Sequence, residues 1–493
     1  MCRVIPLLCH YVSMPELDSE TADIGFTSAI DLAAGLRDGD FTSAELTATL
    51  LHRVRQVDDC ENGLQSVLAI AADAMDQAAD RDTNTGNGRL QGLPVLIKDN
   101  IEAVGLPATA GSLALAGRTV TRDAEIVTRL RNAGAVIMGS TNLSEWANIR
   151  SSQSTSGWSA IGGLTANPWI FQHSAGGSSS GSGAAVAAGL IPFAVGTETD
   201  GSIVCPASLN GVVGIKPTVG TTSRTGVIPI SASQDSPGPM ARNVADASLL
   251  LDVLAGTDTL RQNVVDDSPL RIGIMRQWVT SDLKSQQVFE DSLAILASAG
   301  IELIEVRGAD MTEQDNEDEG AVLFHELLDD LGQYLAARPG DGVKSLADVI
   351  EFNKTHSDSE MMHFQQELFD IAVGTGGRNE VYRQARTRNL EWALHKVLNP
   401  AIADVDVLIG VPYGPAWVST LGEGDDYADA SWMTHAPAIA GWPIGCLPMG
   451  LVRGLPVGMG VVARANDENA LVRAMTRIER VLDLGTLRPT FTQ

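Results

Sequence analysis

The run Leu93-Pro-Val-Leu-Ile-Lys98 is short and apolar and ends in a charged residue. This pattern is typical of a buried strand whose carboxyl end opens onto a site. Further along, residues 124–133 have the apolar spacing of a helix that stops at Gly134, and Ala135-Val-Ile-Met138 follows as a second apolar run. A strand, a helix and a strand in this order predict an α/β fold with a mixed or parallel sheet.

Elements of the same kinds are expected along the rest of the chain. Thr42-Ser-Ala-Glu45 has the pattern of a capping box, which predicts the start of a helix. Further helices are predicted at about 66–80, 243–254 and 467–482, and further strands at 270–275, 407–411, 444–449 and 457–462.

The composition excludes several classes of partner. The 493 residues include 61 Asp and Glu against 34 Lys and Arg, which gives a formal net charge of −27. So few basic residues argue against nucleic acid or an anionic membrane surface as a partner. The content of 44% hydrophobic and 19% charged residues indicates a folded chain with a large core.

The cysteines and the first residues indicate the cellular compartment in which the protein is expected. Five cysteines without a C-x-x-C pair argue against a disulfide framework or a zinc site and favour a reducing compartment. The first residues make a poor signal peptide, and no segment is apolar enough to span a membrane, so we expect a cytoplasmic protein.

We expect an N-terminal extension at 1–20 and one large domain at 21–493, with a variable helical section at about 260–400.

The tract His173–Gly183 and the run Val195–Pro206 are rich in Gly, Ser and Thr. A phosphate-binding loop would need a lysine after its last glycine, which this tract lacks. Gly177-Ser-Ser-Ser-Gly181 matches the G-x-S-x-G elbow of α/β-hydrolases, but a tract of this composition produces that match by chance. That reading also needs a downstream histidine, and His435 alone lies in a Gly/Pro-rich segment suited to a site loop.

A third interpretation uses a lysine as the base that activates a serine. A lysine with an ordinary pKa near 10.4 must lose about 3.4 units, or roughly 4.6 kcal/mol, to be neutral at pH 7. Burial has shifted lysines by about 3–5 units, so a desolvated site can hold a neutral lysine.

Three segments together resemble the amidase signature family. They are Gly92–Asn100 around Lys98, the tract Gly176–Ser182, and Thr197-Glu-Thr-Asp-Gly-Ser-Ile203. The resemblance implies a Ser-cis-Ser-Lys triad in which Lys98 is the base, Ser178 is the bridging serine after a cis peptide bond, and Ser202 is the nucleophile. It also implies an oxyanion hole made by the backbone N–H groups of Thr199, Asp200, Gly201 and Ser202.

The resemblance covers nearly the whole chain and weakens at about 260–400. Gly157-Trp-Ser159 and the run 197–206 look most like the bacterial peptide amidase branch. The implied fold is a large mixed, mostly parallel, twisted sheet flanked by helices on both faces. One departure is Asp200-Gly201-Ser202, where many members have Gly-Gly-Ser.

The implied function is an amidohydrolase that cleaves a peptide or small-molecule amide through an acyl-enzyme and releases ammonia or an amine. The alternative is the glutamine-hydrolysing A subunit of a tRNA-dependent amidotransferase, and a third class is a catalytically inactive binding protein. No metal or cofactor is implied, and a monomer or homodimer is expected. Ser154 and Thr155 are candidate substrate-binding residues, whereas Ser179, Ser180 and Ser182 are interpreted as turn residues.

Overall fold

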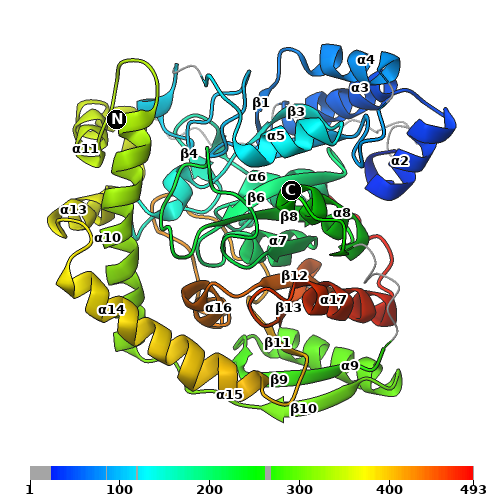
Figure 1. The fold of residues 1–493 in the computed structure, drawn as a ribbon, viewed down its shortest axis with the longest axis vertical. Helices are drawn as coiled ribbons and strands as arrows, with labels where there is room; N and C mark the ends of the chain where they lie inside the picture. Colours follow the sequence, from blue (N-terminus) through cyan, green and yellow to red (C-terminus); the bar gives the residue numbers. More distant parts are fainter. Residues whose placement is uncertain (1–23, 61, 85, 118–119, 261–267, 492–493) are drawn as a thin grey trace, which may run out of the picture.

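A single large sheet forms the centre of the computed structural model, which describes residues 24–60, 62–84, 86–117, 120–260 and 268–491 (Figure 1). The extension predicted at 1–20 lies outside these residues. The eleven strands have the order β1-β3-β2-β6-β8-β7-β12-β13-β11-β9-β10. Their bounds are β1 Val67–Ile70, β2 Pro94–Lys98, β3 Val136–Thr141, β6 Phe193–Glu198, β7 Val213–Lys216, β8 Ser236–Ala241, β9 Arg271–Val279, β10 Glu302–Val306, β11 Val407–Val411, β12 Ile444–Val452 and β13 Leu455–Val462. A separate small pair joins β4, Trp158–Ser159, to β5, Gly163–Leu164.

The sheet is mixed, as predicted, but it is not mostly parallel. β3, β2 and β6 are parallel neighbours, as are β11, β9 and β10, and these account for four of the ten pairs. The other six pairs are antiparallel. A parallel pair needs a crossover connection, and β7 leads to β8 and β12 leads to β13 without an intervening helix, so these strands run antiparallel.

Helices cover both faces of the sheet (Figure 1). On one face α6, Ser180–Ala187, packs against α7, Val204–Asn210. On the other face a row of neighbouring helices is formed by α5 Glu125–Asn132, α8 Val244–Ala255, α17 Glu468–Leu482 and α9 Leu283–Ser298. The strands between the two layers are therefore apolar along most of their length, and β2 and β6 are buried at every position.

The N-terminal helices pack at one end of the sheet. They are α2 Ala29–Asp38, α3 Ser43–Arg53 and α4 Ala74–Thr83. The capping box predicted at the start of α3 is present, with the Thr42 and Glu45 side chains each bonding the backbone of the other residue.

The predicted helix at 66–80 is wrong in its first half, where the chain forms β1 before it enters α4. β1 pairs with β3 at the sheet edge. The Asp58 carboxylate fixes this turn into the strand, because it accepts the N–H groups of Ser66 at 2.7 Å and Val67 at 3.0 Å.

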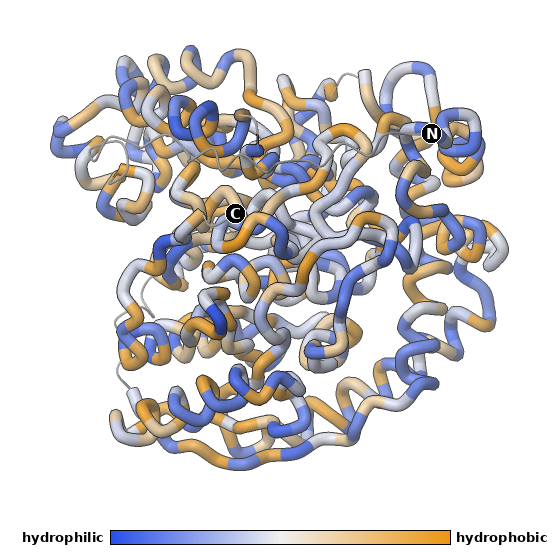
Figure 2. Tube along the Cα trace, turned by 180° about the vertical axis from the view of Figure 1, so that it is seen from behind, coloured by the Kyte–Doolittle hydropathy of each residue, from blue (hydrophilic) through white to orange (hydrophobic). Residues whose placement is uncertain are grey.

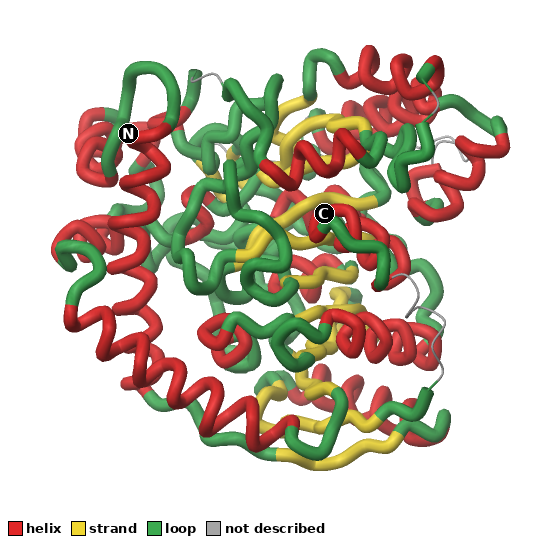
Figure 3. The backbone as a smooth tube through the Cα atoms, viewed as in Figure 1, coloured by secondary structure: helices red, strands yellow, loops and turns green. Residues whose placement is uncertain are grey.

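The section predicted to carry surface helices forms an arc along one side of the molecule. Its helices are α10 Glu313–Ala337, α11 Leu346–Thr355, α12 Ser357–Glu360, α13 Glu367–Gly374, α14 Glu380–Leu390, the π-helix Glu391–Leu398 and α15 Asn399–Ile402. Hydrophilic and hydrophobic residues alternate along the arc, as in amphipathic helices (Figure 2). Loops fill the region between this arc and the sheet (Figure 3). The inner face of α10 buries Leu327, Leu331 and Leu335 in a second apolar cluster.

Two observations concern the cysteines and membrane association. Cys60, Cys205 and Cys446 are free thiols, and the last two are buried among core residues. Among the residues with a described conformation, no helix combines the length and apolar content needed to cross a membrane.

Candidate active site

Three segments from different parts of the chain meet at one edge of the sheet. Lys98 is the last residue of β2, and the loop Thr199–Ile203 follows β6 and leads into α7. β2 and β6 are parallel neighbours, so their carboxyl ends lie at the same edge. Ser178 lies in the turn before α6, and the peptide bond between Gly177 and Ser178 is cis, as the family resemblance implies.

The Lys98 amine is fully buried and contacts hydroxyl and carbonyl oxygens. Its Nζ lies 2.7 Å from Ser178 Oγ, 3.1 Å from Ser179 Oγ, 3.0 Å from Thr197 Oγ1 and 3.3 Å from the Thr197 carbonyl oxygen. No ion pair of Lys98 is found within the described chain, and Asp99 accepts hydrogen bonds from Ala108 and Thr109 instead. Burial lowers the pKa of Lys98 to about 7, against a smaller upward effect of Glu198 and Asp235.

These contacts fit a neutral amine. A neutral amine has two N–H donors and one lone pair. The Ser179 hydroxyl donates to the Thr197 carbonyl at 3.0 Å, so its oxygen is available as an acceptor for Lys98. The lone pair of Nζ can then receive the Ser178 hydroxyl, which is its shortest contact. Ser179, interpreted from the sequence as a turn residue, thus also contacts the Lys98 amine.

Ser202 lies on the segment next to Ser178. The Ser202 carbonyl accepts the N–H of Ser179 at 3.1 Å, and the N–H of Cys205 donates to the Gly201 carbonyl at 2.7 Å. Gly201 has a φ of 75°, a left-handed conformation that favours glycine. Ser178 is fully buried, whereas Ser202 is 9% exposed, and its hydroxyl bonds no residue in the described part of the chain. The structure thus joins Lys98 to Ser178 directly and leaves the Ser202 hydroxyl free.

Two buried carboxylates hold the loop that carries Ser202. Glu198 accepts the N–H groups of Ile203 at 2.6 Å and Val204 at 2.9 Å at the start of α7. Asp235 accepts the hydroxyl of Thr199 at 2.6 Å. Burial raises the pKa of Glu198 and raises that of Asp235 to about 6.

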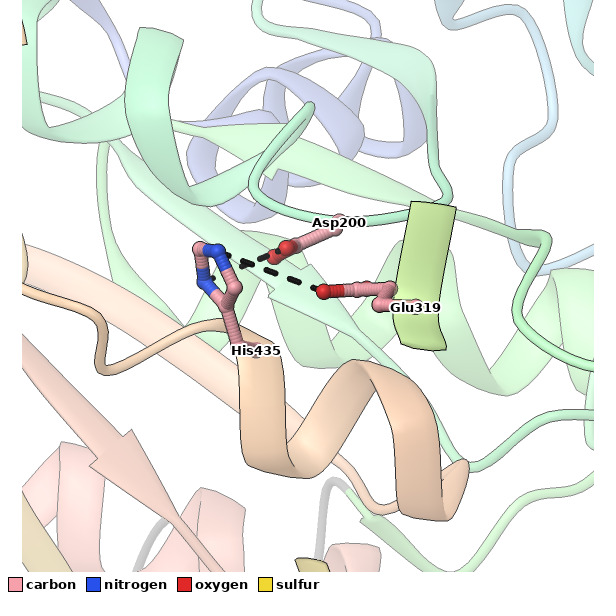
Figure 4. Close-up of side chains that lie close together, drawn as sticks. All are labelled: Asp200, Glu319 and His435. Carbon is pink, nitrogen blue, oxygen red and sulfur yellow. Dashed lines mark ion pairs between the residues drawn. The ribbon is translucent and has the colours of Figure 1, made fainter. Parts of the chain in front are cut away.

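Asp200 forms a cluster with two residues from distant segments, Glu319 of α10 and His435 at the start of α16, His435–Ala440 (Figure 4). Nδ1 of His435 lies 3.2 Å from Asp200 Oδ2, and its Nε2 lies 4.0 Å from Glu319 Oε2. Neither partner of Asp200 was assigned from the sequence. The only sequence feature that pointed to His435 was its Gly/Pro-rich surroundings. Glu319 ends a run of charged residues of the kind found on solvent-exposed helices.

The candidate substrate-binding residues contact protein groups. The Thr155 hydroxyl accepts the N–H of Gly422 at 3.1 Å, and the Ser154 hydroxyl donates to the Asn148 carbonyl at 3.4 Å. The neighbouring Ser156 donates to Asp425 at 2.6 Å. Thr155 and Ser156 bond residues of the loop 420–425, whereas the Ser154 hydroxyl bonds Asn148. Contact of Ser154 and Thr155 with substrate stays a prediction.

An aromatic residue lies over the Ser202 loop. A Cβ atom at Gly201 would lie only 2.5 Å from the Tyr413 hydroxyl. Tyr413 also lines a cavity of about 410 Å³. The other lining residues are Ile170, His173, Gly414, Pro415, Ala416, Trp417, Val418, Asp426, Asp429, Ala430, Arg453 and Leu455. The lining of the cavity combines aromatic and aliphatic residues with Asp426, Asp429 and Arg453.

The other buried lysine has a different environment from Lys98. Lys216 donates to the backbone carbonyls of Trp442 at 2.6 Å and Pro217 at 3.3 Å. Both acceptors are backbone atoms, so the contacts of Lys216 hold the chain around it and do not involve the serine hydroxyls.

Comparison with known proteins identifies similar chains. The family model described as Amidase matches residues 45–472. A probable amidase from Arabidopsis thaliana is 36% identical over 425 residues, covering 80% of this chain and 81% of that protein. The A subunit of the glutamyl-tRNA(Gln) amidotransferase of Pseudomonas aeruginosa is 33% identical over 488 residues, covering 93% of this chain and 98% of that protein.

Solved structures of a peptide amidase are similar over nearly the whole chain. The native peptide amidase from Stenotrophomonas maltophilia has a TM-score of 0.87 and 38% identity, covering 95% of this chain and 99% of that one. A peptide amidase in complex with the competitive inhibitor chymostatin has a TM-score of 0.89 and 39% identity, covering 94% of this chain and 99% of that one.

Proposed function

The chain belongs to the amidase family, and from that membership we propose that it hydrolyses carboxamides, with C-terminal peptide amides as the main substrate class, through Lys98, Ser178 and Ser202. The similarity to peptide amidases supports this substrate class. The single observation that carries the proposed triad is the buried Lys98 amine, 2.7 Å from Ser178 Oγ and with a lowered pKa.

Acylation begins with proton transfer along the triad. Neutral Lys98 accepts the proton of Ser178, Ser178 accepts the proton of Ser202, and Ser202 Oγ attacks the amide carbonyl carbon. The negative charge that develops on the carbonyl oxygen is stabilised by backbone N–H groups of Thr199, Asp200, Gly201 and Ser202. In other enzymes one such donor contributes roughly 3–4 kcal/mol.

Collapse of the tetrahedral intermediate breaks the carbon–nitrogen bond. The leaving nitrogen receives a proton through Ser178 and departs as ammonia or an amine. Water then attacks the acyl-enzyme, gives its proton to the same path, and the carboxylic acid is released with the triad restored.

The amidotransferase A subunit is the second candidate, favoured by the 33% identity over 488 residues. The two functions differ in what they need. An amidase acts alone, whereas the A subunit depends on its partner chains and hydrolyses glutamine.

The test is ammonia release by the purified chain without any partner. We expect turnover of C-terminal peptide amides at rates far above that of glutamine, and no effect of added tRNA. Activity confined to glutamine, and only with the amidotransferase partner chains present, would favour the second candidate.

We also propose a cytoplasmic location and a monomer or homodimer of one large domain. The free thiols Cys60, Cys205 and Cys446 support a reducing compartment. Size-exclusion chromatography with light scattering measures the oligomeric state directly.

A further inference from the structure

The Asp200–His435–Glu319 cluster lies beside the proposed nucleophile and has no part in the mechanism described above. Its members come from the loop after β6, from α10 and from α16 (Figure 4). The side chains of Glu319, Asp200 and His435 are 5%, 18% and 27% exposed, so water screens their charges only partly.

In the cluster, the histidine ring lies between two carboxyl groups. The imidazole of His435 presents Nδ1 to Asp200 at 3.2 Å and Nε2 to Glu319 at 4.0 Å. One ligand atom from each of the three side chains lies within 4.8 Å of the other two. A protonated ring would point one N–H toward Asp200 and the other toward Glu319.

The surrounding charges favour that protonated form. Although burial lowers the pKa of His435, the carboxylates of Asp200 and Glu319 outweigh it and raise this pKa above its ordinary value. Burial and the charge of Asp200 raise the pKa of Glu319 to about 7. Around the cluster, Arg386 of α14 faces Glu319, while Lys216 of β7, Glu198 of β6 and the phenol of Tyr413 face Asp200.

The position of Asp200 makes its charge important for the reaction. Asp200 lies two residues before Ser202 and its own N–H belongs to the proposed oxyanion hole. Asp200 Oδ1 is buried and bonds no hydrogen-bond donor in the described part of the chain. An uncompensated carboxylate there would repel the negative charge that forms on the substrate oxygen in the transition state.

We infer that His435 is a positioning residue whose imidazolium offsets the charge of Asp200 and ties the Ser202 loop to α10. This inference rests on the proposed function of Ser202. It explains how the chain accommodates an aspartate two residues before the proposed nucleophile, since α10 and α16 supply the compensating partners.

The test compares four variants by kcat, KM and pH profile on one peptide amide. They are His435→Gln, Asp200→Asn, the double variant of both, and His52→Gln as a matched control on the exposed face of α3. His435→Gln should lower kcat on the order of 10- to 100-fold, with little change in KM, because the lost interaction acts on transition-state charge. The double variant should regain most of this loss, since the carboxylate that needed compensation is absent.

The pH profile gives a readout that a structural role would not move. The wild-type rate should fall at alkaline pH as His435 loses its proton, and this limb should be absent in His435→Gln and in the double variant. If His435→Gln does not fold, the pH profile of Asp200→Asn is measured instead. Without the Asp200 carboxylate, the rate should no longer depend on whether His435 is protonated.

Two results would overturn the inference. In the first, the rate of a folded His435→Gln or Asp200→Asn variant still falls at alkaline pH as it does in the wild type. In the second, the double variant is no more active than His435→Gln. Ser202→Ala is assayed in parallel. Its activity would refute the proposed nucleophile, whereas an inactive Ser202→Ala beside an unaffected His435→Gln would refute only the role of His435.

Discussion

At the scale of single residues, the protonation state of Lys98 determines whether the proposed triad works. The amine must be neutral to accept a proton, and burial lowers its pKa to about 7. The rate should therefore rise with pH through about 7, by about tenfold per unit on the acid side, until the amine is neutral, and should fall only at the more alkaline pH at which His435 loses its proton.

Substitutions of Lys98 should show whether this residue acts as a base or only supplies a positive charge. Lys98→Ala removes the base and should lower kcat by about 10²–10⁴-fold. Lys98→Arg should be equally inactive, because a guanidinium stays charged at working pH. Steady-state kinetics with Lys284→Arg, an exposed site on α9, as the control checks both. An active Lys98→Arg protein would argue for charge rather than proton transfer.

Lys98, Ser178 and Ser202 could be proposed from the sequence because a family resemblance fixes their order and spacing. Which hydroxyls surround the amine could not, because consecutive serines in a turn point in directions that only the backbone conformation determines. Ser179 and Thr197 contact Lys98 for this reason without having been assigned.

At the scale of elements, the start of α7 sets the position of Ser202. Glu198 accepts the N–H groups of Ile203, the residue before this helix, and Val204, its first residue, and so holds the loop between β6 and α7. Glu198→Ala should destabilise the protein by about 0.5–2 kcal/mol, as other cap deletions do, and should also lower kcat.

A second cap serves as the control for this variant. Asn243 caps α8 by accepting the N–H of Asp246 at 2.7 Å, away from the triad. Asn243→Ala should lower the free energy of unfolding by a similar amount and leave kcat unchanged. Equal kcat values for both variants in the same assay would contradict the role given to Glu198.

Elements with a strong local pattern were predictable, and those decided by distant pairing were not. β11 was predicted at its observed bounds, and the observed α17 begins one residue after the predicted start. The chain at 66–70 is rich in apolar and helix-forming residues, yet the edge of β3 and the Asp58 carboxylate hold it extended. Such tertiary contacts override local propensity.

At the scale of the whole molecule, a buried arginine links the helical arc to the segment that follows β3. Arg150 Nε lies 3.0 Å from Glu145 Oε1, Nη1 donates to the Glu360 carbonyl at 2.7 Å, and the guanidinium carbon lies 4.2 Å from the centre of the Phe364 ring. All of its side chain is buried. Removing one partner of a buried pair leaves an uncompensated charge.

Arg150→Ala should therefore lower the free energy of unfolding by about 3–5 kcal/mol. The control is Arg383→Ala, which breaks an exposed ion pair with Glu380 and should change the free energy of unfolding by at most about 1 kcal/mol. Urea denaturation followed by circular dichroism measures both. A loss for Arg150→Ala no larger than for the control would show that this contact does not hold the arc.

The α/β class and the central sheet followed from the sequence, but the strand directions did not. A mostly parallel sheet was expected, and six of the ten pairs are antiparallel. The position of α10 was also not predictable, because its charged first turns resemble a surface helix while Glu319 turns inward toward Asp200 and His435. Contacts between segments over a hundred residues apart leave no periodic signal in the chain.

The central claim is that Ser202, activated through Ser178 and Lys98, is the nucleophile. The most direct measurement is mass-spectrometric mapping of the adduct formed with a serine-directed fluorophosphonate. We expect one adduct, on the peptide that contains Ser202, formed quickly in the wild type and greatly slowed in Lys98→Ala. An adduct on another residue, or amide turnover by Ser202→Ala at the wild-type rate, would contradict the account.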